Sequence, residues 1–438
     1  MAKRGFSSVC AAALAGGLGV PAIASAQAIL VDEDVAAREG RQAFIIPYAF
    51  HSDVIATAFG IAAGGRGILQ EQDGLVLNQI VSTNGSVVTY LFGEAFRTPW
   101  TDRLFLSPRI MVGDFGAIDT YQDGNPEFPF ERAGSNGSHE DNFLRSEGTD
   151  QWYRLGLRFV APLGHGKDTP IPTYRLEKGL LVDGAAGATS WNPLRSGRTL
   201  VELEPFYRGQ DFDADLGSDE LETGGLRLTL RHENVDFLPN PSRGSVKQLS
   251  VVYDWGVQDD DSSYTLLELE LAKYFDLGES DRFRQRVLAL GFWTADTPSW
   301  EVDSVGGAKV VTHRPPAFFG ATLGGVSRLR GFSTARFNDK AAILYSAELR
   351  VIPRWHPLGD VDFLKRFARV DWWQAVAFAE LGRVSEHWSV SELHSHMKWS
   401  AGVGLRFFVN HLVVRADVAF SHEGGEVQMM VSHPFPSL

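Results

Sequence analysis

Short segments in which apolar and polar residues alternate recur along most of the chain. Between 397 and 407 the even-numbered positions are polar or glycine and the odd-numbered positions are apolar, namely Met397, Trp399, Ala401, Val403, Leu405 and Phe407. Successive side chains of a β-strand point to opposite faces of the sheet, so this pattern predicts a strand with one apolar and one polar face. The same alternation marks 412–420, 343–351, 226–231 and 154–159.

The polar faces of these strands carry charges of both signs in mid-strand, for example Glu348 and Arg350. In a soluble β-sandwich such a face would contact solvent, and this remains the alternative. In a membrane barrel it lines the lumen, because an arginine on the lipid face costs about 2–4 kcal/mol at mid-membrane. We expect an all-β, transmembrane antiparallel barrel of about sixteen strands, near 42–52, 54–65, 73–83, 86–98, 102–115, 150–162, 198–210, 222–233, 245–256, 264–276, 282–295, 340–352, 369–382, 397–408, 411–421 and 425–433.

The N-terminus has the pattern of a secretory signal peptide. Lys3 and Arg4 precede an apolar stretch over 9–23, and Ala24-Ser25-Ala26 supplies the small residues that precede cleavage. A membrane anchor is the alternative, but the apolar stretch is shorter than the roughly 20 residues that a spanning helix needs. We expect a signal peptide over 1–26, a short periplasmic segment over 27–41 and the barrel over 42–438. The sole cysteine, Cys10, then leaves with the signal peptide, which excludes disulfides and thiol catalysis from the mature chain.

Composition adds one exclusion. The 438 residues carry a formal net charge of −13, which argues against a nucleic-acid partner because such partners require a basic face.

The connections between the predicted strands test their count. If the first strand rises from the periplasm, the long segments 116–149 and 296–339 lie outside the cell, where long loops are typical. The segment 163–197 is long yet falls on the periplasmic side, so it can contain a further hairpin that would change the count. The periplasmic segment 353–368 includes a short possible helix over 361–368.

One segment carries a recognisable motif. Gly324-Gly325, followed by Leu329-Arg330-Gly331-Phe332, resembles the signature of the bacterial surface antigen family, the outer-membrane barrel superfamily of BamA, TamA and the two-partner secretion transporters. In that family the motif lies on the sixth extracellular loop. The strand count above independently places it in the sixth extracellular gap.

Three further motifs follow in the family's order. Arg231 and Asn234, with Pro239 and Gly244, resemble its Asp-x-Arg-Asp-Asn…Pro-x-x-Gly turn, although His232 and Glu233 depart from the common form. Phe378, Glu380 and Gly382 resemble its Phe-x-Asp-x-Gly strand, with glutamate for aspartate. Gly402 and Gly404 match its Gly-x-Gly strand. The family's periplasmic POTRA domains have no counterpart in this sequence, and Phe435 is followed by three further residues where most such barrels end in an aromatic residue.

The resemblance implies a lock inside the lumen. Arg330, on an inward-folded loop, would bind Glu380 on the barrel wall, because the planar guanidinium makes two charge-assisted bonds to a carboxylate. Gly331 would allow a close backbone approach, and Phe332 would fill a gap in the wall. The alternative is a solvated arginine in a surface loop.

Other groups of polar residues give weaker evidence for a functional site. His394 and His396, near His387 and Glu392, could bind a metal, but they lie in a predicted loop with no defined geometry, and a solvated loop is the simpler interpretation. We expect no metal, no cofactor and no catalytic site, since no Ser-His-acid set falls on neighbouring strands.

Three functions remain open for an integral outer-membrane protein of a Gram-negative bacterium. By resemblance, the first is outer-membrane biogenesis or the translocation of protein or lipid. The second is a passive or gated pore for solutes, and the third is an adhesion or structural barrel. The expected partners are outer-membrane lipid and either a second copy of the chain or a separately encoded periplasmic protein.

Overall fold

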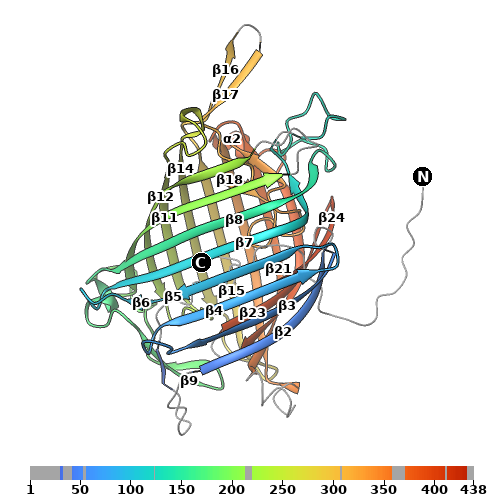
Figure 1. Cartoon of the computed structure of the whole chain (residues 1–438). Helices are drawn as coiled ribbons and strands as arrows, with labels where there is room; N and C mark the ends of the chain where they lie inside the picture. Colours follow the sequence, from blue (N-terminus) through green and yellow to red (C-terminus); the bar gives the residue numbers. More distant parts are fainter. Residues whose placement is uncertain are drawn as a thin grey trace.

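The computed structural model describes residues 30–32, 42–52, 56–122, 124–212, 220–305, 308–357, 370–409 and 412–431. Sixteen strands form one antiparallel sheet that rolls into a barrel (Figure 1). The predicted strand number is confirmed. The strands are β2 (Gln42–Ser52), β3 (Ala56–Arg66), β4 (Gly74–Ser82), β5 (Val87–Glu94), β7 (Leu104–Thr120), β8 (Leu144–Val160), β11 (Arg198–Phe212), β12 (Leu221–Val235), β13 (Gly244–Asp254), β14 (Tyr264–Asp276), β15 (Phe283–Asp296), β20 (Ala341–Pro353), β21 (Val370–Ser385), β22 (Lys398–Val409), β23 (Leu412–Ser421) and β24 (Gly424–Val431).

Each barrel strand pairs with the next one along the chain. The two-residue strand β6 (Phe96–Arg97) continues β5 beyond Ala95, whose φ of 60° breaks the extended backbone. Pairing runs from β2 with β3 to β23 with β24, so the peptide groups of every barrel strand between β2 and β24 have a partner strand on both sides. Strands β7 and β8 have 17 residues each, more than the roughly 9–11 that cross the hydrocarbon. The third extracellular loop is therefore 121–143, shorter than the predicted 116–149.

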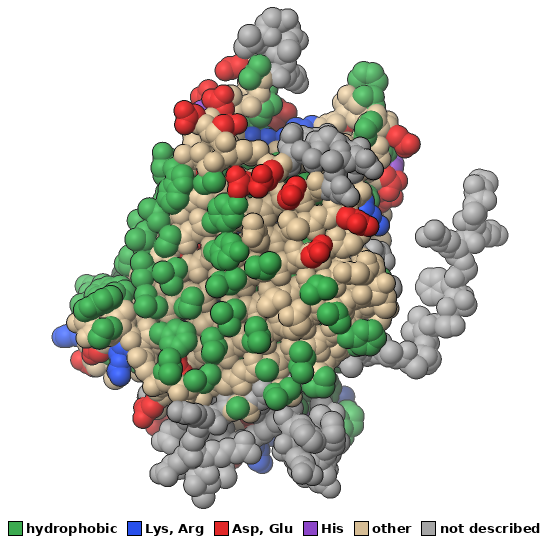
Figure 2. Space-filling model, in the orientation of Figure 1, with side chains coloured by type: hydrophobic (Ala, Val, Ile, Leu, Met, Phe, Trp, Pro, Cys, Tyr) green, Lys and Arg blue, Asp and Glu red, His purple; other side chains and the backbone are tan. Residues whose placement is uncertain are grey.

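The predicted alternation of faces is confirmed. On β22, Trp399 and Val403 are 49% and 58% exposed, whereas the intervening Ser400 and the nearby Arg406 are buried. Figure 2 shows the result on the outer surface, where hydrophobic side chains spread over the wall and acidic ones gather mainly beyond one end of it. The apolar face therefore meets lipid, and the charged face points into the lumen.

The periplasmic end carries a small separate sheet. Within 163–197, after the short 3₁₀ helix η1 (Gly164–Lys167), β9 (Thr173–Glu177) and β10 (Leu180–Asp183) form a hairpin. β1 (Leu30–Asp32) pairs parallel to β9. Thus 163–197 does contain a hairpin, but its strands pair outside the barrel sheet and leave the barrel count unchanged.

This small sheet packs against the ends of the barrel strands. Tyr174 and Leu176 of β9 share an apolar cluster with Phe237, Trp372 and Phe408. The indole N–H of Trp372 also donates to the Gly179 carbonyl over 2.8 Å. These contacts hold the hairpin across the periplasmic end of the lumen.

Short elements occupy the extracellular loops. They are η3 (Asp260–Ser262), β16 (Glu301–Val305), β17 (Ala308–Thr312), β18 (Ala321–Leu323), β19 (Phe337–Asp339) and α2 (Val390–Leu393). Among the described residues, no helix is long and apolar enough to cross a membrane. The predicted signal peptide, the possible helix over 361–368 and the C-terminal Phe435 lie outside the described residues.

We expect Leu228→Arg to destabilise the barrel by about 2–4 kcal/mol, because Leu228 lies mid-strand on the lipid face, 50% exposed. Urea unfolding in lipid vesicles measures this loss. The control is Leu69→Arg, at a position 78% exposed in the turn between β3 and β4, which should change stability little. Equal losses for both variants would mean that the apolar face of β12 does not meet hydrocarbon.

Candidate functional site

The sixth extracellular loop, 297–340, folds back into the barrel. The β16–β17 hairpin projects away from the barrel (Figure 1), whereas β18 and β19 pair with each other and lead into the tip, 324–336. Leu323, Leu329 and Phe332 on this segment are buried in one apolar cluster with Trp293 and Val384 of the wall. The tip is therefore part of the barrel interior.

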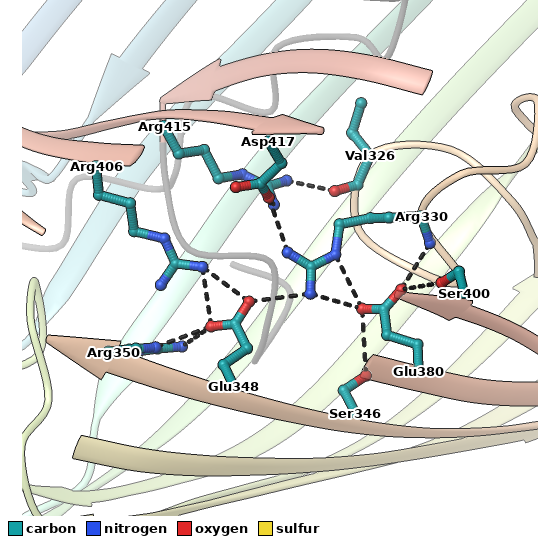
Figure 3. Close-up of polar contacts among 10 residues, drawn as sticks. All are labelled: Val326, Arg330, Ser346, Glu348, Arg350, Glu380, Ser400, Arg406, Arg415 and Asp417. Carbon is teal, nitrogen blue, oxygen red and sulfur yellow. Dashed lines mark hydrogen bonds and ion pairs between the residues drawn. The ribbon is translucent and has the colours of Figure 1, made fainter. Parts of the chain in front are cut away.

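Arg330 is fully buried at the centre of this tip (Figure 3). Its Nε donates to Glu380 Oε1 over 3.0 Å, and its backbone N–H donates to Oε2 of the same carboxylate over 2.6 Å. Nη1 donates to Asp417 Oδ2 over 2.8 Å, and Nη2 lies 3.0 Å from Glu348 Oε1. The loop arginine thus contacts three carboxylates, from β20, β21 and β23.

The wall supplies three further arginines. Arg350 and Arg406 each pair with Glu348 at 2.8 Å, and Arg415 pairs with Asp417 at 2.9 Å while donating to the Val326 carbonyl of the loop. With Arg330 there are four guanidinium groups and three carboxylates, a formal balance of +1. We name these seven residues the lumen network.

The neighbouring carboxylates stabilise the positive charge of Arg330. Burial lowers the pKa of Arg330, but Glu380, Glu348 and Asp417 raise it by more, so the pKa lies above its ordinary value. The guanidinium also lies over the Phe378 ring, 3.5 Å from the centroid.

Glycines allow the tip to approach the wall. Gly331 has a φ of 92°, and an added Cβ would lie 3.2 Å from the Phe420 backbone. A Cβ at Gly404 of β22 would overlap the Asp417 carboxylate, and a Cβ at Gly402 would overlap the Phe378 ring. These glycines therefore make room for the groups that hold Arg330.

The base of the loop packs on the wall through aromatic rings. Phe319 stacks on Phe206 with centroids 5.2 Å apart, and the Arg208 guanidinium lies 4.2 Å from the centre of the Phe318 ring. Arg328 lies over Trp293 at 3.8 Å. Stacked rings, cation–π contacts and the Arg328–Glu268 ion pair fix this side of the loop.

A second arginine of the loop, Arg336, joins three segments. Its Nε donates to Glu423 Oε2, in the turn between β23 and β24, over 2.8 Å. Its Nη1 and Nη2 donate to the hydroxyl and carbonyl of Ser138 in the third extracellular loop, over 2.9 and 2.7 Å. The backbone N–H of Asn338 donates to the Gly134 carbonyl over 2.8 Å. We call these contacts the outer clamp.

The family model described as the Omp85 superfamily domain matches residues 151–429, which is more than half of the chain. The chain belongs to the Omp85 superfamily. This confirms the resemblance drawn from the motifs. It also makes the protein an integral outer-membrane barrel of a Gram-negative bacterium.

Three solved structures are similar to this chain at low sequence identity. CdiB from Escherichia coli is 13% identical with a TM-score of 0.50, and the match covers 91% of this chain and 62% of that one. CdiB from Acinetobacter baumannii is 13% identical with a TM-score of 0.45, and the match covers 89% of this chain and 59% of that one. BamA from Haemophilus ducreyi lacking POTRA domains 1–3 is 14% identical with a TM-score of 0.46, and the match covers 90% of this chain and 70% of that one. The chain therefore spans less than two thirds of either CdiB structure. No curated protein matches the chain.

The Omp85 motif positions separate into two groups. Phe378, Gly402 and Gly404 lie around the lumen network. Gly324 and Gly325 of the loop have φ values of 106° and 101° and lie against Ser333, Thr334 and Arg336. A Cβ at Gly382 would lie 2.9 Å from the Leu323 side chain.

The other group lies at the periplasmic end. Asn234 accepts from the Ala188 N–H over 2.7 Å, Arg231 pairs with Glu233 at 2.9 Å, and Gly244 has a φ of 105°. Pro239 lies in the turn between these strands. Asn234 thereby holds the periplasmic segment around Ala188 against the barrel. None of these four residues contacts Arg330.

Sequence reasoning named Glu380 as the acidic partner but gave no role to Glu348, Asp417 or the arginines around them. Alternation had placed Glu348 and Asp417 on polar faces, which is a signal that they point inward. It carried no information about their height in the barrel.

Of the histidines considered as metal ligands, His394 makes hydrogen-bond contacts with protein groups. His394 Nε2 lies 2.9 Å from the Tyr345 hydroxyl, and its Nδ1 lies 2.7 Å from the Val390 carbonyl. Within the part of the chain that the structure describes, no three His, Cys, Asp or Glu residues are grouped so as to hold a metal ion.

We expect Arg330→Ala to destabilise the folded barrel by about 3–5 kcal/mol, because it leaves buried carboxylates without their shared counter-ion. The measurements are heat-modifiability on gels and extracellular protease sensitivity of the sixth loop. Arg354→Ala is the control: Arg354 pairs with Glu279 on an exposed surface, where such a pair contributes at most about 1 kcal/mol. Unchanged heat-modifiability and protease sensitivity in Arg330→Ala would contradict the lock.

We expect the pair Arg336–Glu423 to show a coupling energy of about 0.5–3 kcal/mol in a double-mutant cycle with Arg336→Ala and Glu423→Gln, because both groups are largely buried. Each single variant should also expose 121–143 to protease. The matched pair is Arg145–Asp119, in which Arg145 is 45% exposed and coupling should be weaker. Equal coupling in the two pairs would argue against the outer clamp.

Proposed function

We propose that this protein is a plugged barrel that acts in outer-membrane biogenesis or in the translocation of protein or lipid. The observation that carries the proposal is Arg330, which is fully buried in the lumen and contacts carboxylates on three wall strands. A loop locked across the interior restricts passive diffusion through the lumen. A barrel that opens only when a substrate is engaged requires such a closed resting state.

The arrangement of the lock supports gated opening. Its carboxylates come from β20, β21 and β23, and the outer clamp adds Glu423 in the turn before β24. A displacement of the last strands therefore strains contacts of the sixth loop, which couples the wall to the plug. We propose that substrate engagement at the wall releases Arg330.

Omp85 proteins work with partner proteins. For this chain we propose a separately encoded periplasmic protein or a second copy of the barrel, acting at the end where β9 and β10 cover the lumen. That sheet faces the periplasmic side, from which a client would arrive.

A gated pore for solutes is the second candidate. The observation in its favour is a cavity of about 310 Å³ lined by charged side chains, which persists in the lumen beside the loop. Charged linings of this kind occur in water-filled barrels.

Conductance in planar bilayers separates the two candidates. For the proposed function, the purified protein stays mostly closed with brief openings, Arg330→Ala opens more often because the plug is loosened, and Arg354→Ala behaves like the unmodified protein. Steady, large openings of the unmodified protein would identify a pore and contradict the proposal.

Depletion of the protein, followed by proteomic and lipid analysis of the outer membrane, identifies the substrate class. A loss of specific barrel proteins indicates protein insertion, and altered lipid content indicates lipid transport. Unchanged protein and lipid content together with lost surface attachment would instead support an adhesion barrel.

A further inference from the structure

The cavity beside the sixth loop has a defined boundary. Phe318, Phe319 and Gly320 at the base of the loop form one side, and inward side chains of β7, β8 and β11–β14 form the other. Its volume of about 310 Å³ lies at the lower end of the range for small-molecule sites. Six arginines and four glutamates line it, so the lining favours an anionic ligand.

Most arginines around the cavity have an acidic partner. Arg158 donates to Glu202 over 2.6 Å, and Arg227 and Arg328 share Glu268. These arginines are paired without a ligand, although Arg227 and Arg328 have only Glu268 between them.

Arg154 is different. It points inward from the middle of β8, and among the described residues no carboxylate lies within ion-pair distance of its guanidinium, which lies over the Trp152 ring at 5.2 Å. Glu204 attracts it electrostatically, whereas Arg227, Arg208 and Arg109 repel it. Arg154 thus stands in a locally positive part of the lumen.

The strand register places two arginines directly opposite each other. Arg154 of β8 is the cross-strand partner of Arg109 of β7, a like-charge pair that is unfavourable by itself. Arg109 donates through Nε to Glu94 over 2.9 Å, but its Nη2 is buried with no hydrogen-bond partner among the described residues. A buried donor left unpaired costs free energy, and the Arg109 guanidinium is only partly satisfied by Glu94.

We propose that the cavity binds a small oxyanion, carried as a phosphate or carboxylate group, between Arg154 and Arg109. The anion relieves the repulsion between the two guanidinium groups and accepts from donors that the protein leaves unused. Guanidinium groups suit this role because their planar N–H pairs match the oxygens of such anions. Glu204, 3.7 Å from Arg109, is the group that competes with the anion.

The test is titration of the purified barrel with inorganic phosphate at constant ionic strength, followed by phosphorus NMR line broadening. Arg154→Gln should weaken binding by about tenfold or more, the loss expected for a charge-assisted hydrogen bond. Glu204→Gln should bind at least as tightly as the unmodified protein, because it removes a competing charge. The control is Arg145→Gln, on the same strand but paired with Asp119 near the extracellular end, which should leave binding unchanged.

Arg154→Gln should weaken phosphate binding, whereas Glu204→Gln should not. This difference distinguishes a binding site from a general effect of substitution on folding. Absence of phosphate binding, equal affinity in Arg154→Gln and the unmodified protein, or the same response to chloride would each overturn the site. A parallel titration with a short-chain anionic phospholipid distinguishes the source of the anion: preference for the lipid assigns a head group, and preference for phosphate assigns a free solute. If Arg154→Gln fails to fold, weaker phosphate binding by Glu204→Gln overturns the proposal.

Discussion

Hydrocarbon offers no hydrogen-bond partner to a peptide group, and the rest of this structure depends on that constraint. A chain that crosses the membrane in strands must pair each strand with a neighbour, which produces the sixteen-strand antiparallel sheet. Pairing then divides the side chains into a lipid face and a lumen face. The charged residues of the chain have only the lumen and the ends of the barrel available, so they meet at high density inside.

The lumen network is a consequence of that density. Burying ions is costly, and a buried ion pair is weak evidence for stability because desolvation offsets the attraction. The network instead favours one position of the loop over others, because Arg330 contacts all three carboxylates only in that position. Moving the loop leaves Glu348, Glu380 and Asp417 facing the wall arginines without their central partner. The plug is therefore held by a discrete arrangement and does not slide gradually.

The contacts of the sixth loop are distributed unevenly around the barrel. Ion pairs of the lumen network bind it to β20, β21 and β23, and the outer clamp reaches the turn before β24. Aromatic stacking also holds the loop base against β11, and a cation–π contact of Arg328 in the tip reaches β15. The C-terminal strands and the loop thus form one connected unit, whereas the cavity lies toward β7, β8 and β11–β14.

The sequence by itself determined the strands, their faces and the place of the sixth loop, because a period of two residues is a local property that survives in any barrel. Even the inward direction of Glu380 followed from alternation, and its pairing with Arg330 followed from family resemblance. The tertiary structure decided which inward residues share a height. Glu348 and Asp417 reach Arg330, and Arg154 faces Arg109, only because of strand register and tilt. Register is set by hydrogen bonding between whole strands, so no local pattern encodes it.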